Sequence, residues 1–381
     1  MIQSFSYVQP MGIEFGAGAR KQLPELLNRY GRRVLLITGC RWFNQSGWKR
    51  EFLALLKNFQ YYQLSCPGGE PSSEGLEELL NQARGFDPEV ILAVGGGSVL
   101  DTAKAISGLL PLNDRVDDFL EGVGRGLKIT EAGIPWLAVP TTSGTGAEVT
   151  KNAVIKSRAR GLKRSLRSPY LISALAVVDP ELILECPLRV SGIAGLDALS
   201  QLIESFVSRR SKPVPRALIR SAFPLMLKAL KVIPENLSDL AARTGAAYGA
   251  MISGLALSNS GLGAAHGFAS GLGGLYDIPH GLICALFIGP VLKVNGELIR
   301  KDCEILVREA GAPAECDPIE WLSAEIEALL SAFKLPSDLR SYSVSPERVA
   351  EIAGRSAGSS MSGNPRELSL QEREELIRGL I

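Results

Sequence analysis

The first half of the chain alternates short apolar runs with stretches in which apolar residues recur every three or four positions. β-branched and other apolar residues follow one another in four runs, which predict strands at 33–39, 61–65, 88–94 and 134–139. Helices are predicted at 47–58 and 72–84, where apolar residues have helical spacing. Strands that alternate with helices indicate a parallel sheet covered on both faces.

From about residue 187 the pattern changes, and no convincing strand pattern occurs again. Composition and helical periodicity predict helices at 215–233, 238–257, 318–333 and 370–381. A chain of 40.8 kDa exceeds the size at which one hydrophobic core keeps growing. We therefore expect an α/β domain over residues 1–186 and an all-helical domain over residues 187–381.

The stretch 244–276 contains no charged side chain over 33 residues, which is long enough to span a bilayer. Glycines, serines, Asn259 and His266 interrupt it, so buried helices are expected instead. A net charge of +1 disfavours a nucleic-acid partner, and six cysteines without a CxxC pair indicate neither a disulfide framework nor a zinc ribbon. The first residues lack a basic start and an apolar core, so we expect a cytoplasmic protein that binds no membrane.

The sequence VILAVGGGSVLDTAKAI, residues 90–106, has the order strand, glycine turn, helix start. Gly95, Gly96 and Gly97 remove side chains where the chain turns, and the helix that follows presents free N–H groups, which favours a phosphate site. The pattern is neither G-x-G-x-x-G nor a Walker motif. A plain strand-to-helix connection remains open, in which Ser98 caps the helix and Asp101 completes a capping box.

A second loop, PTTSGTGAEVT at 140–150, follows the next predicted strand. It carries the hydroxyls of Thr141, Thr142 and Thr145 at the carboxyl end of a parallel strand, where open α/β sheets bind ligands. Two such loops at neighbouring strand ends predict a dinucleotide site, to which Ser98 and Asp101 of the first loop also belong. The alternative is that both are ordinary turns.

Six motifs together resemble the iron-containing (group III) alcohol dehydrogenases, in the same order and over essentially the whole chain. They are GGGSVLDTAKAI, PTTSGTGAEVT, VVDPEL, AGLDALSQLIESFVS, HGFASGLGGLYDIPHG and GNPREL. The resemblance implies an N-terminal dinucleotide-binding α/β domain and an all-helical C-terminal domain with a divalent metal, the architecture shared with dehydroquinate synthase. It also implies a cleft between the domains, NAD(P)-dependent alcohol oxidation or aldehyde reduction, and a homodimer or higher homo-oligomer.

The metal site of that family consists of an aspartate, a histidine four residues later, and two more histidines. Asp197, His266 and His280 match three of these positions, and His266 and His280 are the only histidines in the chain. Gln201 stands where the remaining histidine is expected. It shares a helix face with Asp197 at i, i+4, so its amide oxygen could serve as a ligand. Without the resemblance, two such histidines are more often satisfied core or loop residues.

A neutral amide oxygen is a weaker ligand than imidazole for Fe²⁺ or Zn²⁺. The affinity for metal is then reduced, shifted toward harder ions, or lost. Ser270 stands where many members of the family carry a second histidine near the substrate. The proton would then travel through water, a ribose hydroxyl or Ser270.

At the end of the first predicted strand, an acidic residue would bind the adenosine ribose and repel a 2′-phosphate. The chain has Gly39 there, and Arg41 could pair with the phosphate, which predicts NADP over NAD. The alternative is that Gly39 is only a turn residue. A basic run at 156–167 is expected to be an exposed hairpin, in which Lys163 matches a lysine that reaches the cofactor ribose in the family.

These residues favour reversible hydride transfer between NADP(H) and a small aldehyde or primary alcohol, with a metal polarising the oxygen. Asn152 and Val154 are expected to line the substrate side. Two alternatives remain. The first is a glycerol dehydrogenase or dehydroquinate synthase-like lyase on the same architecture. The second is a catalytically silent nucleotide-binding protein with a degraded metal site.

Overall fold

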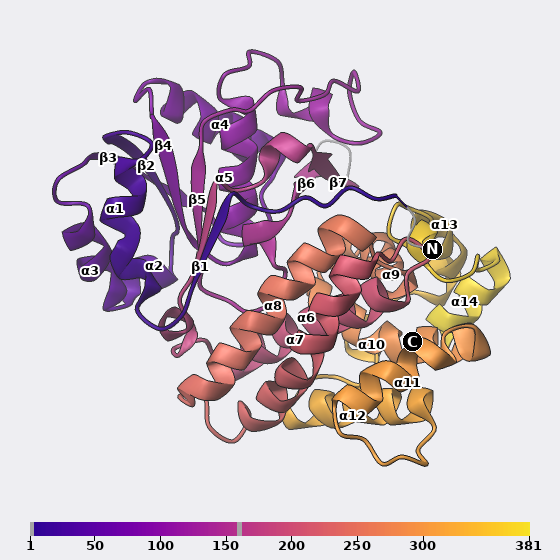
Figure 1. The fold of residues 1–381 in the computed structure, drawn as a ribbon. Coiled ribbons are helices and arrows are strands. Elements are labelled where there is room, and N and C mark those ends of the chain that lie inside the picture. Colours follow the sequence, from indigo (N-terminus) through magenta and orange to yellow (C-terminus); the bar gives the residue numbers. More distant parts are fainter. Residues whose placement is uncertain (1–3, 158–161) are drawn as a thin grey trace. The chain divides into compact units, whose positions relative to one another are not determined.

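The computed structural model describes residues 4–157 and 162–381, and these form two compact units. The α/β unit consists of Val8–Thr142 and Ala147–Ile183. The helical unit consists of Leu184–Ile381, the short segment Ser143–Gly146 and the described residues before Val8 (Figure 1).

Six parallel strands form the sheet of the α/β unit, in the order β1-β8-β5-β4-β2-β3. The strands are β1 (Gly12–Phe15), β2 (Arg33–Gly39), β3 (Gln60–Cys66), β4 (Val90–Gly95), β5 (Trp136–Pro140) and β8 (Leu175–Val178). The helices are α1 (Leu23–Asn28), α2 (Trp42–Gln45), α3 (Trp48–Leu55), α4 (Ser73–Arg84) and α5 (Gly97–Leu109). Short 3-10 helices are η1 (Ala19–Gln22), η2 (Val116–Phe119), η3 (Ala147–Val149), η4 (Pro169–Leu171) and η5 (Pro180–Ile183). The expected parallel sheet with helices on both faces is confirmed.

Consecutive residues of β2 face opposite sides of the sheet, and both sides are covered (Figure 1). Leu35 and Ile37 belong to a core shared with α4 and α5. Val34 and Leu36 belong to a second core shared with α1, α2 and α3. A parallel strand that is buried on both faces has a continuous apolar run rather than alternation, which is why the sequence pattern identified it.

The edge strands β1 and β8 were not predicted from the sequence. Each has four residues, which is too short to show a period, and they pair with each other in register from Gly12↔Leu175 to Phe15↔Val178. Asp179, directly after β8, accepts hydrogen bonds from the backbone of Gly18 at 3.0 Å and from the Arg20 guanidinium at 2.6 Å. Both carboxylate and guanidinium are buried. This ion pair links the segments that follow β1 and β8, the two strands at this edge of the sheet.

The strand order reverses between β2 and β4. From β2 the chain runs outward to β3 on one side, and β4 continues to β5, β8 and β1 on the other. In open parallel sheets, ligands bind beyond the carboxyl ends of the strands at such a point. β2 ends at Gly39 and β4 ends at Gly95, so the fold brings the two predicted cofactor-binding glycine positions to one edge.

The basic run at 156–167 contributes to an antiparallel ribbon of β6 (Asn152–Ser157) and β7 (Leu162–Arg167). The ribbon agrees with the expected hairpin. Residues 158–161, which include Arg158 and Arg160 of the basic run, lie outside the described residues.

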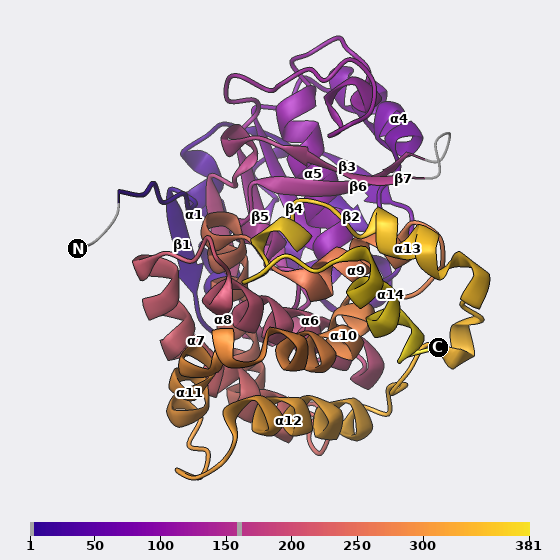
Figure 2. The same cartoon turned by 90° about the vertical axis from the view of Figure 1, so that its right-hand side faces the viewer.

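The helical unit contains α6 (Leu188–Val207), α7 (Pro213–Val232), α8 (Leu240–Ser260), α9 (Ala264–Gly273), α10 (His280–Asn295), α11 (Arg300–Glu309), α12 (Pro318–Ala332), α13 (Val349–Arg355) and α14 (Leu370–Arg378). Its 3-10 helices are η6 (Gly296–Leu298), η7 (Arg340–Tyr342), η8 (Pro346–Arg348) and η9 (Met361–Gly363). The four helices expected from periodicity are confirmed as α7, α8, α12 and α14. α9 and α10 lie beside one another, and α10 also packs on α6 (Figure 2).

By length and apolar composition the stretch His280–Leu298 would suffice to cross a membrane, but 61% of it is buried inside the protein. α10 packs against α6, α9 and α12, as a core helix does. The uncharged stretch 244–276 forms most of α8 and all of α9, and the residues of both helices are mostly buried.

Candidate functional site

Three predicted metal ligands come together in the helical unit. Asp197 lies on α6, His266 on α9, and His280 is the first residue of α10. Asp197 Oδ1 is 3.4 Å from His266 Nε2 and 4.0 Å from His280 Nε2. Asp197 and His266 are buried, whereas 38% of the His280 side chain is exposed. The cluster therefore has one solvent-accessible side.

Glu204 fixes the orientation of His266. Its Oε2 lies 2.6 Å from His266 Nδ1, and its Oε1 accepts a hydrogen bond from the backbone N–H of Ala265 at 2.7 Å. Glu204 is on α6, two turns after Asp197, so one helix holds both sides of the imidazole. A carboxylate at Nδ1 keeps the proton on that nitrogen and directs Nε2 toward the cluster, as in many metal sites. Sequence analysis did not identify Glu204.

Two buried polar atoms in the cluster make no hydrogen bond with any described residue: Asp197 Oδ1 and His266 Nε2. Leaving such atoms unsatisfied costs about 1–3 kcal/mol each. Both face the same point, and oxygen and imidazole nitrogen are suitable ligands for Fe²⁺ or Zn²⁺. The residues therefore fit a divalent cation.

The charges around His266 are strongly coupled. Burial alone would lower the pKa of His266, but the facing Cys284, Asp197 and Glu204 outweigh it and hold that pKa well above its usual value. Burial would raise the pKa of Asp197, but the two imidazoles outweigh it and hold that pKa below its usual value.

Cys284 is a fourth member of the cluster that sequence analysis missed. Its sulfur and the ligand atoms of Asp197, His266 and His280 all lie within 4.8 Å of one another. Cys284 follows His280 by four residues on α10, and this helical spacing is the signal that identifies it. Burial raises the pKa of its thiol to about 12.

Gln201 lies beside the cluster but turns its oxygen away from it. Its Nε2 donates a hydrogen bond to Asp197 Oδ2 at 3.2 Å, and its Oε1 accepts one from Ser253 Oγ on α8 at 2.7 Å. In this arrangement Gln201 orients the carboxylate and does not present a ligand atom.

Ser270 is exposed on α9, one turn after His266. Its hydroxyl donates a hydrogen bond to the carbonyl of His266 at 3.0 Å. A role in proton transfer would require this bond to break.

The glycine turn of the α/β unit does not contain the capping box that the sequence left open as an alternative. The N-cap residue of α5 is Gly96, and no side chain caps the helix. Ser98 is therefore not the cap, because α5 begins earlier, at Gly97. A Cβ on Gly95 would lie 2.6 Å from Val99, so this position requires glycine. The open N-terminus of α5 is available to an anion.

Asp101 connects α5 to β6 instead of closing a cap. Its Oδ2 accepts a hydrogen bond from the backbone N–H of Val154 at 2.9 Å, and its Oδ1 is 3.2 Å from Lys104 Nζ. The buried Lys104 also donates to Thr150 Oγ1 and to the carbonyl of Asn152. Sequence analysis missed Lys104, which fixes the start of β6, where Asn152 and Val154 lie.

Three titratable groups lie at this connection: Lys104 and Glu148, which are buried, and Asp101, which is partly buried. Burial raises the pKa of Asp101 and lowers that of Lys104, although their mutual attraction opposes both changes. Burial also raises the pKa of the nearby Glu148 to about 7. At each of the three groups the effect of burial therefore outweighs that of the neighbouring charges.

The remaining predicted cofactor-binding residues fall at several places. Thr141 and Thr142 follow β5, and the Thr142 side chain would lie 3.4 Å from a Cβ on Gly96. Thr145 belongs to the helical unit. Arg41 is exposed directly after β2 and its Gly39. Lys163 on β7 forms an ion pair with Glu70 at 2.6 Å, so a nucleotide would have to compete with that carboxylate.

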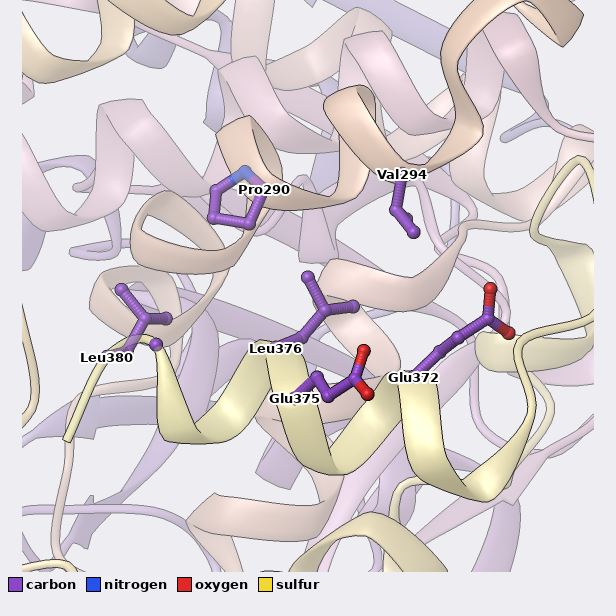
Figure 3. Close-up of a pocket in the computed structure, with 7 residues that line it drawn as sticks. Pro290, Val294, Glu372, Glu375, Leu376 and Leu380 are labelled. Atoms are coloured by element: carbon purple, nitrogen blue, oxygen red, sulfur yellow. The ribbon is translucent and has the colours of Figure 1, made fainter.

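A surface hollow of ≈ 250 Å³ lies elsewhere in the helical unit, between α10 and the C-terminal segment (Figure 3). Pro290 and Val294 line one side, and Leu376 and Leu380 line the other. Glu372 at its rim is engaged with Arg366 at 2.6 Å. None of the predicted site residues lines this hollow.

Comparisons with known proteins agree over both units. Residues 10–180 match the family described as iron-containing alcohol dehydrogenase, and residues 192–381 match the C-terminal part of the Fe-containing alcohol dehydrogenase family. An NAD-dependent methanol dehydrogenase from Bacillus methanolicus is 27% identical, with 98% of this chain and 99% of that protein covered. An NADPH-dependent butanol dehydrogenase from Clostridium saccharobutylicum is 27% identical, with 97% and 96% covered. The crystal structure of a 1,3-propanediol oxidoreductase has a TM-score of 0.92 at 26% identity, with 100% of both chains covered.

Proposed function

We propose a specific reaction for this chain, which belongs to the iron-containing alcohol dehydrogenase family and is a nicotinamide-dependent oxidoreductase of alcohols. It interconverts small uncharged aldehydes and primary alcohols with NADP(H), at a metal centre of Asp197, His266 and His280. The finer parts of this proposal are the ligand set, the choice of NADP and the class of substrate.

One observation carries the metal centre. Asp197 Oδ1 and His266 Nε2 are buried, have no hydrogen-bonding partner among the described residues, and face each other at 3.4 Å. Histidines that serve only in packing normally satisfy their ring nitrogens. A cation bound between these two atoms would give both of them a partner. The partly exposed His280 then marks the side from which substrate approaches.

When bound, a divalent metal supplies a Lewis acid that polarises the oxygen of the substrate. Neighbouring side chains orient the proposed ligands for this role. Glu204 holds the Nδ1 proton of His266, and Gln201 holds one oxygen of Asp197, so each ligand keeps a single orientation. The buried wall formed by α6 and α9 excludes water from two sides of the cluster, which strengthens electrostatic interactions within it.

The choice of NADP rests on the end of β2. A carboxylate at position 39 would repel a 2′-phosphate, and the chain has Gly39 followed by the exposed Arg41. Arg41 makes no ion pair with another described residue, so its guanidinium is available to a phosphate. The names of the relatives include both an NAD-dependent and an NADPH-dependent enzyme. The local residues are therefore the basis for this choice.

Replacing Gly39 by aspartate is expected to lower the NADPH:NADH ratio of kcat/KM by about 10- to 100-fold, because the carboxylate repels the phosphate and binds ribose hydroxyls. A Cβ at this position would lie 3.6 Å from Val99, an ordinary contact, so the backbone has room for a Cβ there. Steady-state kinetics with both cofactors measure the ratio. Gly39→Ala is the control, with room for its methyl group and no charge. An unchanged ratio in Gly39→Asp would show that this position does not meet the 2′ substituent.

A small uncharged substrate is supported by the residues near the two sites. The segments that carry the cluster are rich in alanine, glycine and leucine, and no arginines converge on the motif positions. Asn152 and Val154, held by Lys104 and Asp101, are the proposed substrate-lining residues. A homodimer or higher homo-oligomer in the cytoplasm completes the proposal.

The proposal is tested by NADPH consumption with butanal, using chelator-stripped protein under anaerobic conditions. Turnover is expected only after ferrous or zinc ion is restored, because the apoprotein lacks the Lewis acid. Equal turnover without metal would remove the metal centre from the mechanism. If NADPH binds but no member of a broad aldehyde panel is reduced, the silent nucleotide-binding alternative replaces the proposed function.

A further inference from the structure

Two side chains compete for the fourth position around the metal centre. Each lies one helical turn after a proposed ligand: Gln201 after Asp197 on α6, and Cys284 after His280 on α10. Both are buried. The helical spacing is the same for both residues, so their side-chain contacts must distinguish them.

We propose that Cys284, and not Gln201, supplies the fourth protein ligand of this centre, as a thiolate. The resulting donor set is one carboxylate, two imidazoles and one sulfur. This inference rests on the proposed function, since it concerns the same metal, and it adds both a ligand and a metal preference to it.

The position of the sulfur supports the proposal. Cys284 Sγ lies within 4.8 Å of the ligand atoms of Asp197, His266 and His280, and these four atoms are mutually within that distance. Four donor atoms at these separations are close enough to bind one ion. Cys284 is fully buried, whereas 38% of the His280 side chain is exposed.

The contacts of Gln201 exclude it as a competitor. Its amide N–H already donates to Asp197 Oδ2, and its oxygen already accepts from Ser253. Turning the amide by half a rotation would place its oxygen 3.2 Å from that carboxylate oxygen, so two acceptors would face each other. Gln201 therefore acts as a positioning residue for Asp197.

Charge gives a second reason. A buried dication needs compensating charge, and among the other three proposed ligands Asp197 supplies the negative charge, while the Glu204 carboxylate lies at Nδ1 of His266 and is not itself a ligand. A thiolate supplies the second. The metal displaces the thiol proton, which leaves to solvent, and the four-ligand site becomes electrically neutral.

The consequence is a preference among metals. Thiolate is a soft ligand that favours zinc, whereas carboxylate and amide oxygens favour harder ions. Gln201 considered alone predicts a shift toward harder ions. With Cys284 in the ligand set, we expect the opposite, a centre that takes Zn²⁺ in preference to Fe²⁺.

Cobalt substitution tests the ligand directly. Chelator-stripped full-length protein is titrated anaerobically with Co²⁺, which gives visible d–d bands in any protein site and an intense near-ultraviolet charge-transfer band only with a thiolate. We expect both features in the wild-type protein, and loss of the near-ultraviolet band alone in Cys284→Ser. Zinc affinity in that variant should fall at least ~10-fold. Gln201→Ala and Cys303→Ser should retain the charge-transfer band, the latter because Cys303 is a buried cysteine on α11, outside the cluster.

X-ray absorption on the zinc-loaded wild-type protein provides a measurement that needs no variant. A sulfur neighbour at about 2.3 Å is expected beside nitrogen and oxygen at about 2.0–2.2 Å. Visible cobalt bands without the thiolate band, or a zinc shell without sulfur, would overturn the assignment of Cys284 and leave the proposed function standing. If wild-type protein binds neither ion, the metal centre itself fails, and the assignment of Cys284 fails with it.

Discussion

Asp197→Asn is expected to reduce kcat/KM for aldehyde reduction by at least ~10³-fold, together with loss of bound metal. The substitution keeps the size of the side chain but replaces an anionic ligand by a neutral amide at a buried position. The polarisation supplied by a metal corresponds to several kcal/mol of transition-state stabilisation, and each 1.36 kcal/mol is tenfold in rate. Metal content by elemental analysis and steady-state kinetics measure the two effects on the same preparation.

The matched control is Asp239→Asn, at the N-cap of α8 in the same unit. Asparagine and aspartate cap helices equally well, so this variant should retain metal and activity. Circular dichroism establishes that both variants are folded. Full metal content and unchanged turnover in Asp197→Asn would contradict the proposed role of this carboxylate.

Gly281→Ala is expected to destabilise the helical unit by about 1–3 kcal/mol and to lower activity about 10²-fold. Gly281 follows His280 and lies where α10 packs on α6. A Cβ there would be 2.3 Å from the carbonyl oxygen of Ile193 and 2.8 Å from Cβ of Asp197. The helices must separate to admit it, and this separation moves the ligands on α10 away from Asp197. Thermal unfolding and metal affinity measure the two consequences.

Gly289→Ala on the same helix is the control for this prediction. The nearest atom to its Cβ would be Ser323 Oγ at 3.6 Å, an ordinary contact. Alanine also has a higher helix propensity than glycine, by up to about 1 kcal/mol. Gly289→Ala should therefore be neutral or slightly stabilising. If Gly281→Ala behaves in the same way, close packing of α10 on α6 is not what sets the ligand positions.

The sequence predicted the central sheet well for a physical reason. β2 and β4 are buried on both faces, so their apolar runs are unbroken and easily recognised. β1 and β8 are four-residue strands at the edge of the sheet. What fixes them is the pairing of Arg20 with Asp179, two residues far apart in the chain. No local pattern contains that information.

The sequence predicted the site residues that belong to family motifs, but not those whose place in the site depends on how helices pack. The motifs identified the family, which the comparisons confirm, and they singled out Asp197 and both histidines. Glu204 and Cys284 were missed, although each lies at helical spacing from a proposed ligand. Their roles depend on how α6, α9 and α10 pack together. The alternative of a capping box at Ser98 is excluded, because α5 begins at Gly97, two residues before the first helical position that a Ser98 cap would give.

The proposed ligands come from three separate helices of one unit, α6, α9 and α10. A metal bound to all of them is a cross-link, and it closes long loops of chain whose freedom would otherwise favour the unfolded state. The ion then stabilises the folded helical unit in addition to its role in catalysis. Two preparations of identical sequence but different metal content therefore differ in stability. Their resistance to heat and to proteases should be compared only at equal metal content.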